Sequence, residues 1–216
     1  MTARQLVAEA LGTALLVAVV VGSGIMASRL TEDTALALLA NALATGAGLY
    51  VLITVFAPVS GAEFNPAVTL LGLMQGRHRP FAALLRIIAQ VGGGAAGTIL
   101  THAMFGLALV QAGATVRSGG PQWLAEGVAT FGLVLAILGA GTRAAPVVAC
   151  YITAAYWFTA STSFANPAVT IARALTDSFA GIRAVDAPGF ILAQLVGAGG
   201  AALLGPWLFR PVPATK

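Results

Sequence analysis

Charged side chains are scarce in this chain, where Asp, Glu, Lys and Arg together make up 8% of 216 residues. A soluble domain normally carries about 25%, so the composition excludes an ordinary soluble fold. The single cysteine, Cys150, excludes an intrachain disulfide. Histidine is limited to His78 and His102, and no His, Cys, Asp and Glu cluster has metal-ligand spacing. We expect no metal and no cofactor, and without a recognisable nucleophile, base or phosphate loop we expect no enzyme.

Long apolar runs are what the chain has instead. Hydrophobic residues make up 58% of it, and the mean hydropathy is +0.91. A membrane-spanning helix needs about 20 mostly apolar residues, and six segments meet that length within a single transmembrane domain, residues 1–216. The predicted spans are residues 4–29, 34–56, 80–103, 122–142, 145–162 and 187–209.

The basic balance of the chain, a net charge of +4 with a pI near 10.0, follows membrane topology rather than a nucleic-acid footprint. With a cytoplasmic N-terminus, six spans place seven basic residues inside and four outside, as the positive-inside rule requires. We expect a multi-pass protein of the inner (plasma) membrane with both termini cytoplasmic, a lipid bilayer around it and no nucleic-acid partner. The inside set is Arg4, Arg77, Arg79, Arg86, Arg143, Arg210 and Lys216, and the outside set is Arg29, Arg117, Arg173 and Arg183.

One five-residue segment occurs twice inside this apolar sequence. Asn favours the N-cap of a helix and Pro its first turn, so each copy predicts the start of a short helix, near 66–74 and 167–175. Irregular backbone is tolerated at membrane depth only when it is buried in protein or lines a water-filled cavity. A capping Asn uses its side-chain oxygen, which leaves its NH2 free to donate into that cavity. The copies are Asn65-Pro66-Ala67-Val68-Thr69 and Asn166-Pro167-Ala168-Val169-Thr170.

The repetition extends over two halves of the chain, about 1–105 and 120–212. Three spans in each half is an odd number, so the second half enters the membrane from the opposite side. The sequence predicts an all-α membrane protein with six transmembrane helices and two re-entrant half-helices in an inverted repeat. Secondary transporters of small polar solutes also use inverted repeats, so that function stays open as the alternative. The further matching positions are Glu9 with Glu126, Thr13 with Thr130, and Gln90 with Gln194.

These paired motifs resemble the aquaporin and aquaglyceroporin (major intrinsic protein) family over nearly the whole chain. The resemblance implies a homotetrameric passive channel for small neutral solutes, with one pore in each subunit. It also implies that the half-helices meet end to end at mid-membrane and that Asn65 and Asn166 face the pore. Glu9, Glu126, Gln90 and Gln194 are expected to support the re-entrant loops as buried hydrogen-bonding groups.

The selectivity filter departs from the family pattern. Family members usually have Arg directly after the second Asn-Pro-Ala, where this chain has Val169, and the other aligned filter positions are Thr45, Ala154 and Ser163. This ring has no cation and no aromatic side chain, so we expect a wide pore for water and for larger solutes such as glycerol, urea or metalloid hydroxides. The filter resembles that of bacterial members found with arsenic-resistance genes, which adds methylated arsenicals as a solute class.

Two charged residues are expected near the pore entrances. Arg173 lies one turn beyond Val169. It either places a positive charge at the outer mouth of the pore or pairs with Asp177 at i,i+4, and we favour the pairing with Asp177. Glu63 stands where the family often has His. One interpretation is that it contacts solutes or responds to pH, and the other is that it accepts hydrogen bonds from loop N–H groups or Ser60. For Glu63 we favour the second interpretation.

Overall fold

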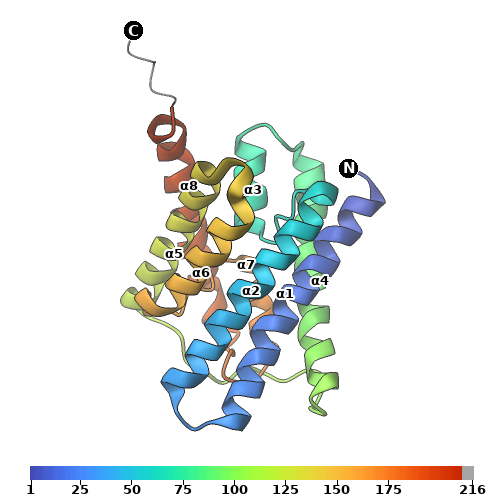
Figure 1. The fold of residues 1–216 in the computed structure, drawn as a ribbon, viewed down its shortest axis with the longest axis vertical. Helices are drawn as coiled ribbons and strands as arrows, with labels where there is room; N and C mark the ends of the chain where they lie inside the picture. The colour runs from blue at the N-terminus through green and yellow to red at the C-terminus, as the bar shows by residue number, and fades with distance from the viewer. Residues whose placement is uncertain (211–216) are drawn as a thin grey trace.

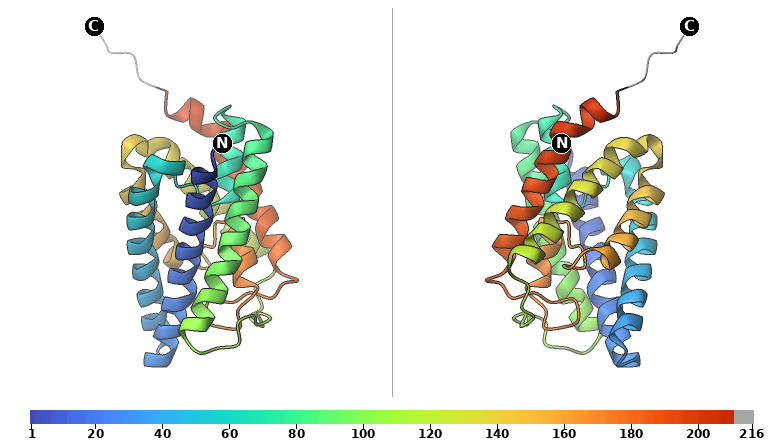
Figure 2. Two further views of the ribbon diagram at one scale, coloured as in Figure 1. Left: turned by 90° about the vertical axis from the view of Figure 1, so that its right-hand side faces the viewer. Right: turned by 90° about the vertical axis from the view of Figure 1, so that its left-hand side faces the viewer.

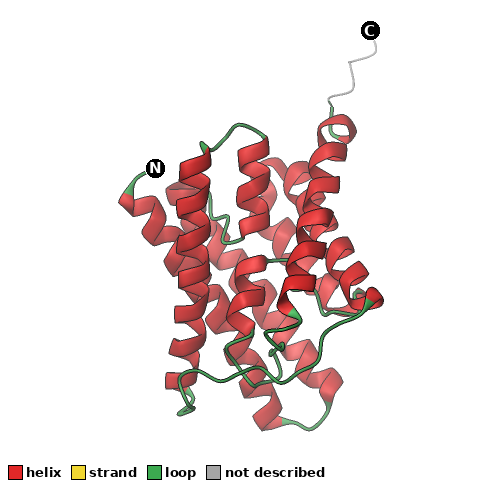
Figure 3. Ribbon diagram, turned by 180° about the vertical axis from the view of Figure 1, so that it is seen from behind, coloured by secondary structure: helices red, strands yellow, loops and turns green. Residues whose placement is uncertain are grey.

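The computed structural model describes residues 1–210, and every regular element in that range is helical (Figure 1, Figure 3). Two of the helices are short and begin inside the bundle, whereas the others are long and surround them. The end of the second predicted repeat, residues 211–212, and Lys216 lie outside the described residues. The elements are α1 (Ala3–Leu30), α2 (Thr34–Ser60), α3 (Pro66–Met74), α4 (Pro80–Met104), α5 (Gly120–Ala140), η1 (Gly141–Arg143), α6 (Ala144–Phe158), α7 (Pro167–Arg173) and α8 (Ala187–Leu208).

The observed helices confirm the predicted fold class. Five helical stretches are long and apolar enough to cross a membrane, and one of them, Gly120–Phe158, is 39 residues long. Gly141, with a left-handed φ of 55°, and the turn η1 divide this stretch into α5 and α6, which gives six crossings. Three elements end two or more residues earlier than predicted: α5 at Ala140 rather than 142, α6 at Phe158 rather than 162, and α7 at Arg173 rather than 175.

The two halves have the same internal arrangement. In the first half α1 packs against α2 and α4, and in the second half α5 packs against α6 and α8, while α2 against α6 joins the halves. The half-helix α3 enters from the end of the bundle where the chain begins, and α7 enters from the opposite end (Figures 1 and 2). We call these the α3 end and the α7 end.

Glycine allows the tightest of these helix crossings. A Cβ at Gly93 of α4 would collide with the carbonyl oxygen of Ala10 on α1, and a Cβ at Gly197 of α8 would collide with the carbonyl oxygen of Gly127 on α5. The backbones therefore approach one another directly, as small residues permit in membrane helices. Many large apolar side chains on the outside are exposed, such as Leu203 at 78% and Val196 at 68%, which suits a surface that faces lipid.

Candidate functional site: a cavity between two half-helices

The two capping asparagines lie at the centre of the molecule and connect its halves. Asn65 accepts from the Ala67 N–H at 2.9 Å and Asn166 from the Ala168 N–H at 3.0 Å, so both cap their helices as predicted. Each NH2 also donates across the centre, from Asn65 to the Ala165 carbonyl and from Asn166 to the Phe64 carbonyl, both at 2.8 Å. An amide NH2 has two hydrogens, so one remains on each Asn for a solute, rather than the whole group as predicted.

The loops before the asparagines hold an unusual backbone. Ala62 and Phe64 have left-handed φ values of 50° and 49°, and Ser163 and Ala165 have 51° and 49°. Such conformations cost on the order of 1–3 kcal/mol each for residues other than glycine and persist only where the surroundings enforce them. A buried carboxylate hydrogen-bonds to N–H groups of each loop and holds this backbone conformation, Glu9 in the first loop and Glu126 in the second.

Glu9 binds the first loop from α1. Its side chain is fully buried and accepts hydrogen bonds from the Ser60 hydroxyl at 2.6 Å and from the N–H groups of Phe64 at 2.8 Å and Glu63 at 3.2 Å. Arg86 of α4 donates to the same carboxylate at 3.2 Å, and Gln90 donates at 2.8 Å. A buried carboxylate requires this kind of pairing, and through these contacts Glu9 joins α1 and α4 to the first loop.

Glu126 binds the second loop in the same manner from α5. It accepts from the N–H groups of Phe164 and Ala165, both at 2.9 Å, and from Gln194 at 2.6 Å. The amide of Gln194 also donates to Thr170 at 2.9 Å, just as that of Gln90 donates to Thr69 at 2.9 Å. Glu126 has no arginine within ion-pair distance among residues 1–210, so the two repeats differ at this point.

A cavity with a volume of ≈ 140 Å³ runs past the asparagines. At its centre Val68 and Val169 lie beside Asn65 and Asn166, and its α3 end reaches Glu63 and other residues of the first loop. Each half-helix N-terminus carries roughly half a positive charge, so the centre disfavours cations while the Asn amides donate to solute oxygens. Apolar side chains form most of the remaining wall.

The predicted filter positions are only partly brought together. Thr45, Ser163 and Val169 line the cavity, but Ala154 is exposed on the outer side of α6, so that assignment was wrong. Ile152 and Tyr156, four residues apart on one helical face, line the cavity instead. Ala154 lies two residues from each of them, which turns it to the opposite face.

Tyr156 also corrects the expectation that the filter contains no aromatic side chain. Its hydroxyl lies 3.1 Å from the Thr45 hydroxyl, and both side chains are buried. The segment between α6 and Asn166 is short enough that the cavity-facing position falls ten residues before Asn166 rather than twelve. The opening at the α7 end is therefore narrower than four small side chains would make it.

Arg173 lies inside the cavity wall and not on the surface. It is 2% exposed, donates from Nε to the Ala180 carbonyl, and lines the α7 end. Its guanidinium carbon lies 3.3 Å from the centre of the Phe164 ring. The favoured pairing with Asp177 was wrong, because the Asp177 carboxylate accepts from the Ala114 N–H instead. The cavity wall therefore carries one positively charged side chain at this end, four residues beyond Val169, where the family usually has its arginine.

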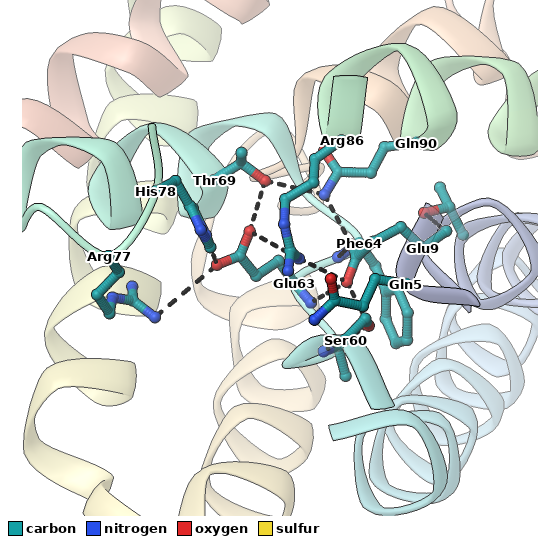
Figure 4. Close-up of polar contacts among 12 residues, drawn as sticks. Gln5, Glu9, Ser60, Glu63, Phe64, Thr69, Arg77, His78, Arg86 and Gln90 are labelled. Atoms are coloured by element: carbon teal, nitrogen blue, oxygen red, sulfur yellow. Dashed lines mark hydrogen bonds and ion pairs between the residues drawn. The ribbon is translucent and has the colours of Figure 1, made fainter. Parts of the chain in front are cut away.

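Glu63 lines the α3 end of the cavity within a cluster of charges (Figure 4). His78 Nε2 lies 2.7 Å from its carboxylate, and the Thr69 hydroxyl donates at 2.8 Å. Arg77 and Arg86 lie 3.8 and 3.5 Å from it. We favoured hydrogen bonds to Glu63 from Ser60 or from loop N–H groups. That interpretation was wrong, because Ser60 and the loop N–H groups donate to Glu9.

Sequence reasoning missed four further residues at the ends of the cavity. At the α3 end Arg77 and His78 follow the short helix α3, and at the α7 end Phe164 and Arg117 meet Arg173. A basic pair directly after the first half-helix was a readable signal for the first two. No signal places Arg117, because it lies in the irregular segment between the repeats. Within residues 1–210 no group of three His, Cys, Asp or Glu side chains could hold a metal ion.

Two half-helices of an inverted repeat that meet at a cavity, with one Asn amide from each half beside it, form the arrangement of a transmembrane channel. The model of the family described as Major intrinsic protein matches residues 1–147, and the chain belongs to that family. It is a multi-pass membrane protein, a passive channel and not an enzyme.

Two curated relatives and one solved structure illustrate the similarity. The chain is 58% identical to aquaglyceroporin AqpS of Rhizobium meliloti over 213 residues, which cover 96% of this chain and 91% of the relative. It is 35% identical to aquaporin TIP1-1 of Arabidopsis thaliana over 139 residues, which cover 62% of the chain and 55% of the relative. The X-ray structure of the aquaglyceroporin from Plasmodium falciparum shares the fold, with a TM-score of 0.70 at 20% identity, over 93% of this chain and 94% of that chain.

Proposed function

We propose that this channel conducts small neutral polar solutes larger than water, such as glycerol, urea and metalloid hydroxides or methylated arsenicals, in addition to water. Val169 carries the proposal, because it lines the cavity directly after the second Asn-Pro-Ala and fills less space than an arginine. Ser163 and Thr45 add small hydroxyl side chains to the same end. The similarity to an aquaglyceroporin supports the same solute class.

The asparagines and the half-helices give the proposed channel its selectivity for neutral solutes. The remaining N–H of each Asn donates to a solute oxygen and orients it at the centre of the cavity. The positive ends of α3 and α7 face the same point, and such half-helix dipoles exclude protons and cations. Val68 and Val169 add an apolar surface for the carbon atoms of a polyol.

The proposal extends to topology and assembly. We place both termini on the cytoplasmic side of the plasma membrane, because α1 begins and α8 ends at the same end of the bundle (Figure 1) and the basic residues of the α3 end favour the cytoplasm. The family resemblance supports a homotetramer, which native mass spectrometry of the detergent-solubilised protein would measure.

Stopped-flow light scattering on proteoliposomes tests the solute range. Rapid flux is expected for water, glycerol, urea and arsenite gradients. Val169→Arg should reduce glycerol and urea flux at least tenfold and water flux much less, because the guanidinium fills the filter. Thr115→Arg, an exposed loop position at the same end, is the matched control and should leave all fluxes unchanged. Rapid water flux with glycerol excluded from the unmodified channel would contradict the proposal.

Coupled transport is the alternative function, and the hydrogen bonds between the two halves at the centre of the molecule argue against it. Alternating access moves one repeat against the other, but Asn65 and Asn166 bind the opposite loop through buried hydrogen bonds at 2.8 Å. Solute that only equilibrates across the vesicle membrane, with or without an ion gradient, is the expected result. Gradient-driven accumulation above equilibrium would establish the transporter instead.

A further inference from the structure

The helices α5 and α8, which pack side by side (Figure 2), leave a groove on the outer surface of the molecule. The groove has a volume of ≈ 610 Å³ and is lined only by apolar side chains and glycines. Leu124, Leu192 and Val196 on its sides are 69%, 65% and 68% exposed. It shares no lining residue with the cavity between the half-helices, so it is a separate feature that faces the lipid.

Glycines allow the groove to reach down to the backbone. A Cβ at Gly197 would collide with the carbonyl oxygen of Gly127, so α5 and α8 touch directly at this point. A Cβ at Gly189 would lie 2.6 Å from Nε1 of Trp123, so the indole ring lies against the backbone of α8. The floor of the groove is therefore made by main-chain atoms and one aromatic ring.

The glycines on the floor belong to the second repeat only. When the halves are aligned on their paired Glu and Gln residues, Gly127 corresponds to Ala10 and Gly189 corresponds to Leu85. The first repeat thus has side chains at both positions where the second repeat has none. The inverted repeat by itself does not require the groove.

The groove extends through about one leaflet of the membrane. It begins at Trp123 in the first turn of α5 and ends at Phe131, a rise of about 12 Å at 1.5 Å per residue. One leaflet contributes about 15 Å to a hydrocarbon core of about 30 Å. Beyond the groove, Phe131 lies over Gly200 and Leu138 lies over Gly205, so side chains fill the contact between α5 and α8 in the other leaflet.

We propose that this groove binds one acyl chain of a phospholipid from the leaflet at the α7 end. A flexible apolar chain matches both the depth and the apolar lining. A transmembrane helix from a second copy would cross both leaflets, and a stable protein interface needs roughly 20–30 residues a side, more than line this groove. Trp123 lies where the chain meets the headgroup region, the level that tryptophan prefers. The bound chain covers the direct contact between Gly127 and Gly197.

Quenching of tryptophan fluorescence by a brominated lipid tests the groove. The chain has three tryptophans, so Trp157→Phe together with Trp207→Phe leaves Trp123 alone. A phosphatidylcholine with a dibrominated stearoyl chain is titrated into the full chain in dodecyl maltoside micelles. Quenching should saturate at a low lipid fraction, because bromine atoms held in the groove contact the indole ring.

The matched control is the full chain with Trp157 as its only tryptophan, made by Trp123→Phe together with Trp207→Phe. Trp157 lies near the end of α6 at the α7 end and is 48% exposed, against 43% for Trp123, but it does not line the groove. Its quenching should rise only in proportion to the lipid fraction. If both proteins are quenched alike, the groove has no preference for lipid and the proposal is overturned.

A side chain that fills the groove should remove the saturable quenching of Trp123. Gly127→Leu should raise the lipid fraction for half-maximal quenching at least fivefold, because a Cβ there fits at 3.5 Å from its nearest neighbour and the rest of the side chain occupies the floor. Gly92→Leu is the matched control, since Gly92 is exposed on α4 with open space around it, and it should leave the value unchanged. An unchanged value for Gly127→Leu would overturn the proposal.

Val196→Phe keeps the test decisive if Gly127→Leu does not fold, because it fills the groove from the exposed side of α8 and should have the same effect. A second copy of the chain in the groove would give a different result. Trp123 would then be shielded from the brominated lipid at every lipid fraction, and Val196→Phe would weaken the oligomer in native mass spectrometry. That result overturns the binding of an acyl chain.

Discussion

At the residue scale, the buried glutamates Glu9 and Glu126 each hold one loop by accepting hydrogen bonds from its N–H groups, but their electrostatic surroundings differ. Glu126 is held by neutral donors alone, whereas Glu9 also binds the buried Arg86 at 3.2 Å. The loss of one partner of a buried ion pair leaves the other charge without compensation, which costs about 3–5 kcal/mol. The loss of a neutral hydrogen bond in the interior costs about 1–3 kcal/mol. The repeats should therefore differ in their tolerance of the same substitution.

We expect Glu126→Gln to lower the free energy of unfolding by about 2 kcal/mol, since one loop N–H then faces an NH2 group instead of an oxygen. Glu9→Gln should cost more, about 3 kcal/mol, because Arg86 loses the nearer of its two carboxylates and keeps only Glu63 at 3.5 Å. Denaturant unfolding in detergent micelles measures both. Glu32→Gln, an exposed position in the loop before α2, should be neutral. Equal losses for the two buried glutamates would show that Arg86 contributes nothing.

Residue positions close to a motif were predictable, and those set by loop geometry were not. Val169 follows the second Asn-Pro-Ala directly, so its place in the cavity follows from the half-helix alone. Ala154 was assigned by a fixed count back along the chain, and the count failed because the loop after α6 shifts the cavity-facing side to Tyr156. The surroundings of Arg173 depend on Phe164 and Arg117, whose meeting is a tertiary event that no local pattern records.

At the element scale, hydropathy and the capping residues predicted the helices well, since a span needs only length and apolar character. The helix crossings depend instead on single glycines. Gly93 lies against the backbone of α1, while its neighbour Gly92 has open space around the position of a Cβ. Adjacent glycines in one helix therefore have opposite consequences for packing.

Gly93→Ala should destabilise the channel by 2 kcal/mol or more, at about the cost of overpacking a tight interface, because α4 must move away from α1. Gly92→Ala should be neutral or stabilising by up to about 1 kcal/mol, since alanine favours helix over glycine. Thermal unfolding of both variants in the same detergent compares them directly. A larger loss for Gly92→Ala would contradict the crossing described for α1 and α4.

At the scale of the whole molecule, the loops at the α7 end join the two repeats. Asp186, in the loop before α8, accepts from the Arg117 backbone N–H at 2.9 Å and from the Arg183 side chain at 2.9 and 3.0 Å. The hydrogen bonds from Arg183 are the main cause of the lowered pKa of Asp186, which lies below its ordinary value of 3.8. The segment between the repeats is thus anchored by an ionised carboxylate.

A carboxyl group whose pKa is lowered on folding stabilises the folded state above its ordinary pKa and loses that effect as pH falls through the lowered value. Asp186→Asn should therefore melt below the unmodified chain at pH 7, and the two melting temperatures should converge below about pH 4. Differential scanning fluorimetry across this pH range measures the convergence. Glu32→Gln serves as the control with no expected difference, and a constant gap for Asp186→Asn at all pH values would rule out the anchor.

The hydrogen bonds between the central asparagines and the opposite loops also constrain the order of biosynthesis. Asn65 donates to a carbonyl 100 residues further along the chain, and Phe64 accepts from an amide 102 residues away. When α1 to α4 have been synthesised, Ala165 and Asn166 have not yet been added to the chain. The Asn65 amide and the Phe64 carbonyl therefore lack these hydrogen-bond partners until the second loop is made. Each copy of the motif is completed by the other, and the centre of the pore is therefore among the last parts of the molecule to form.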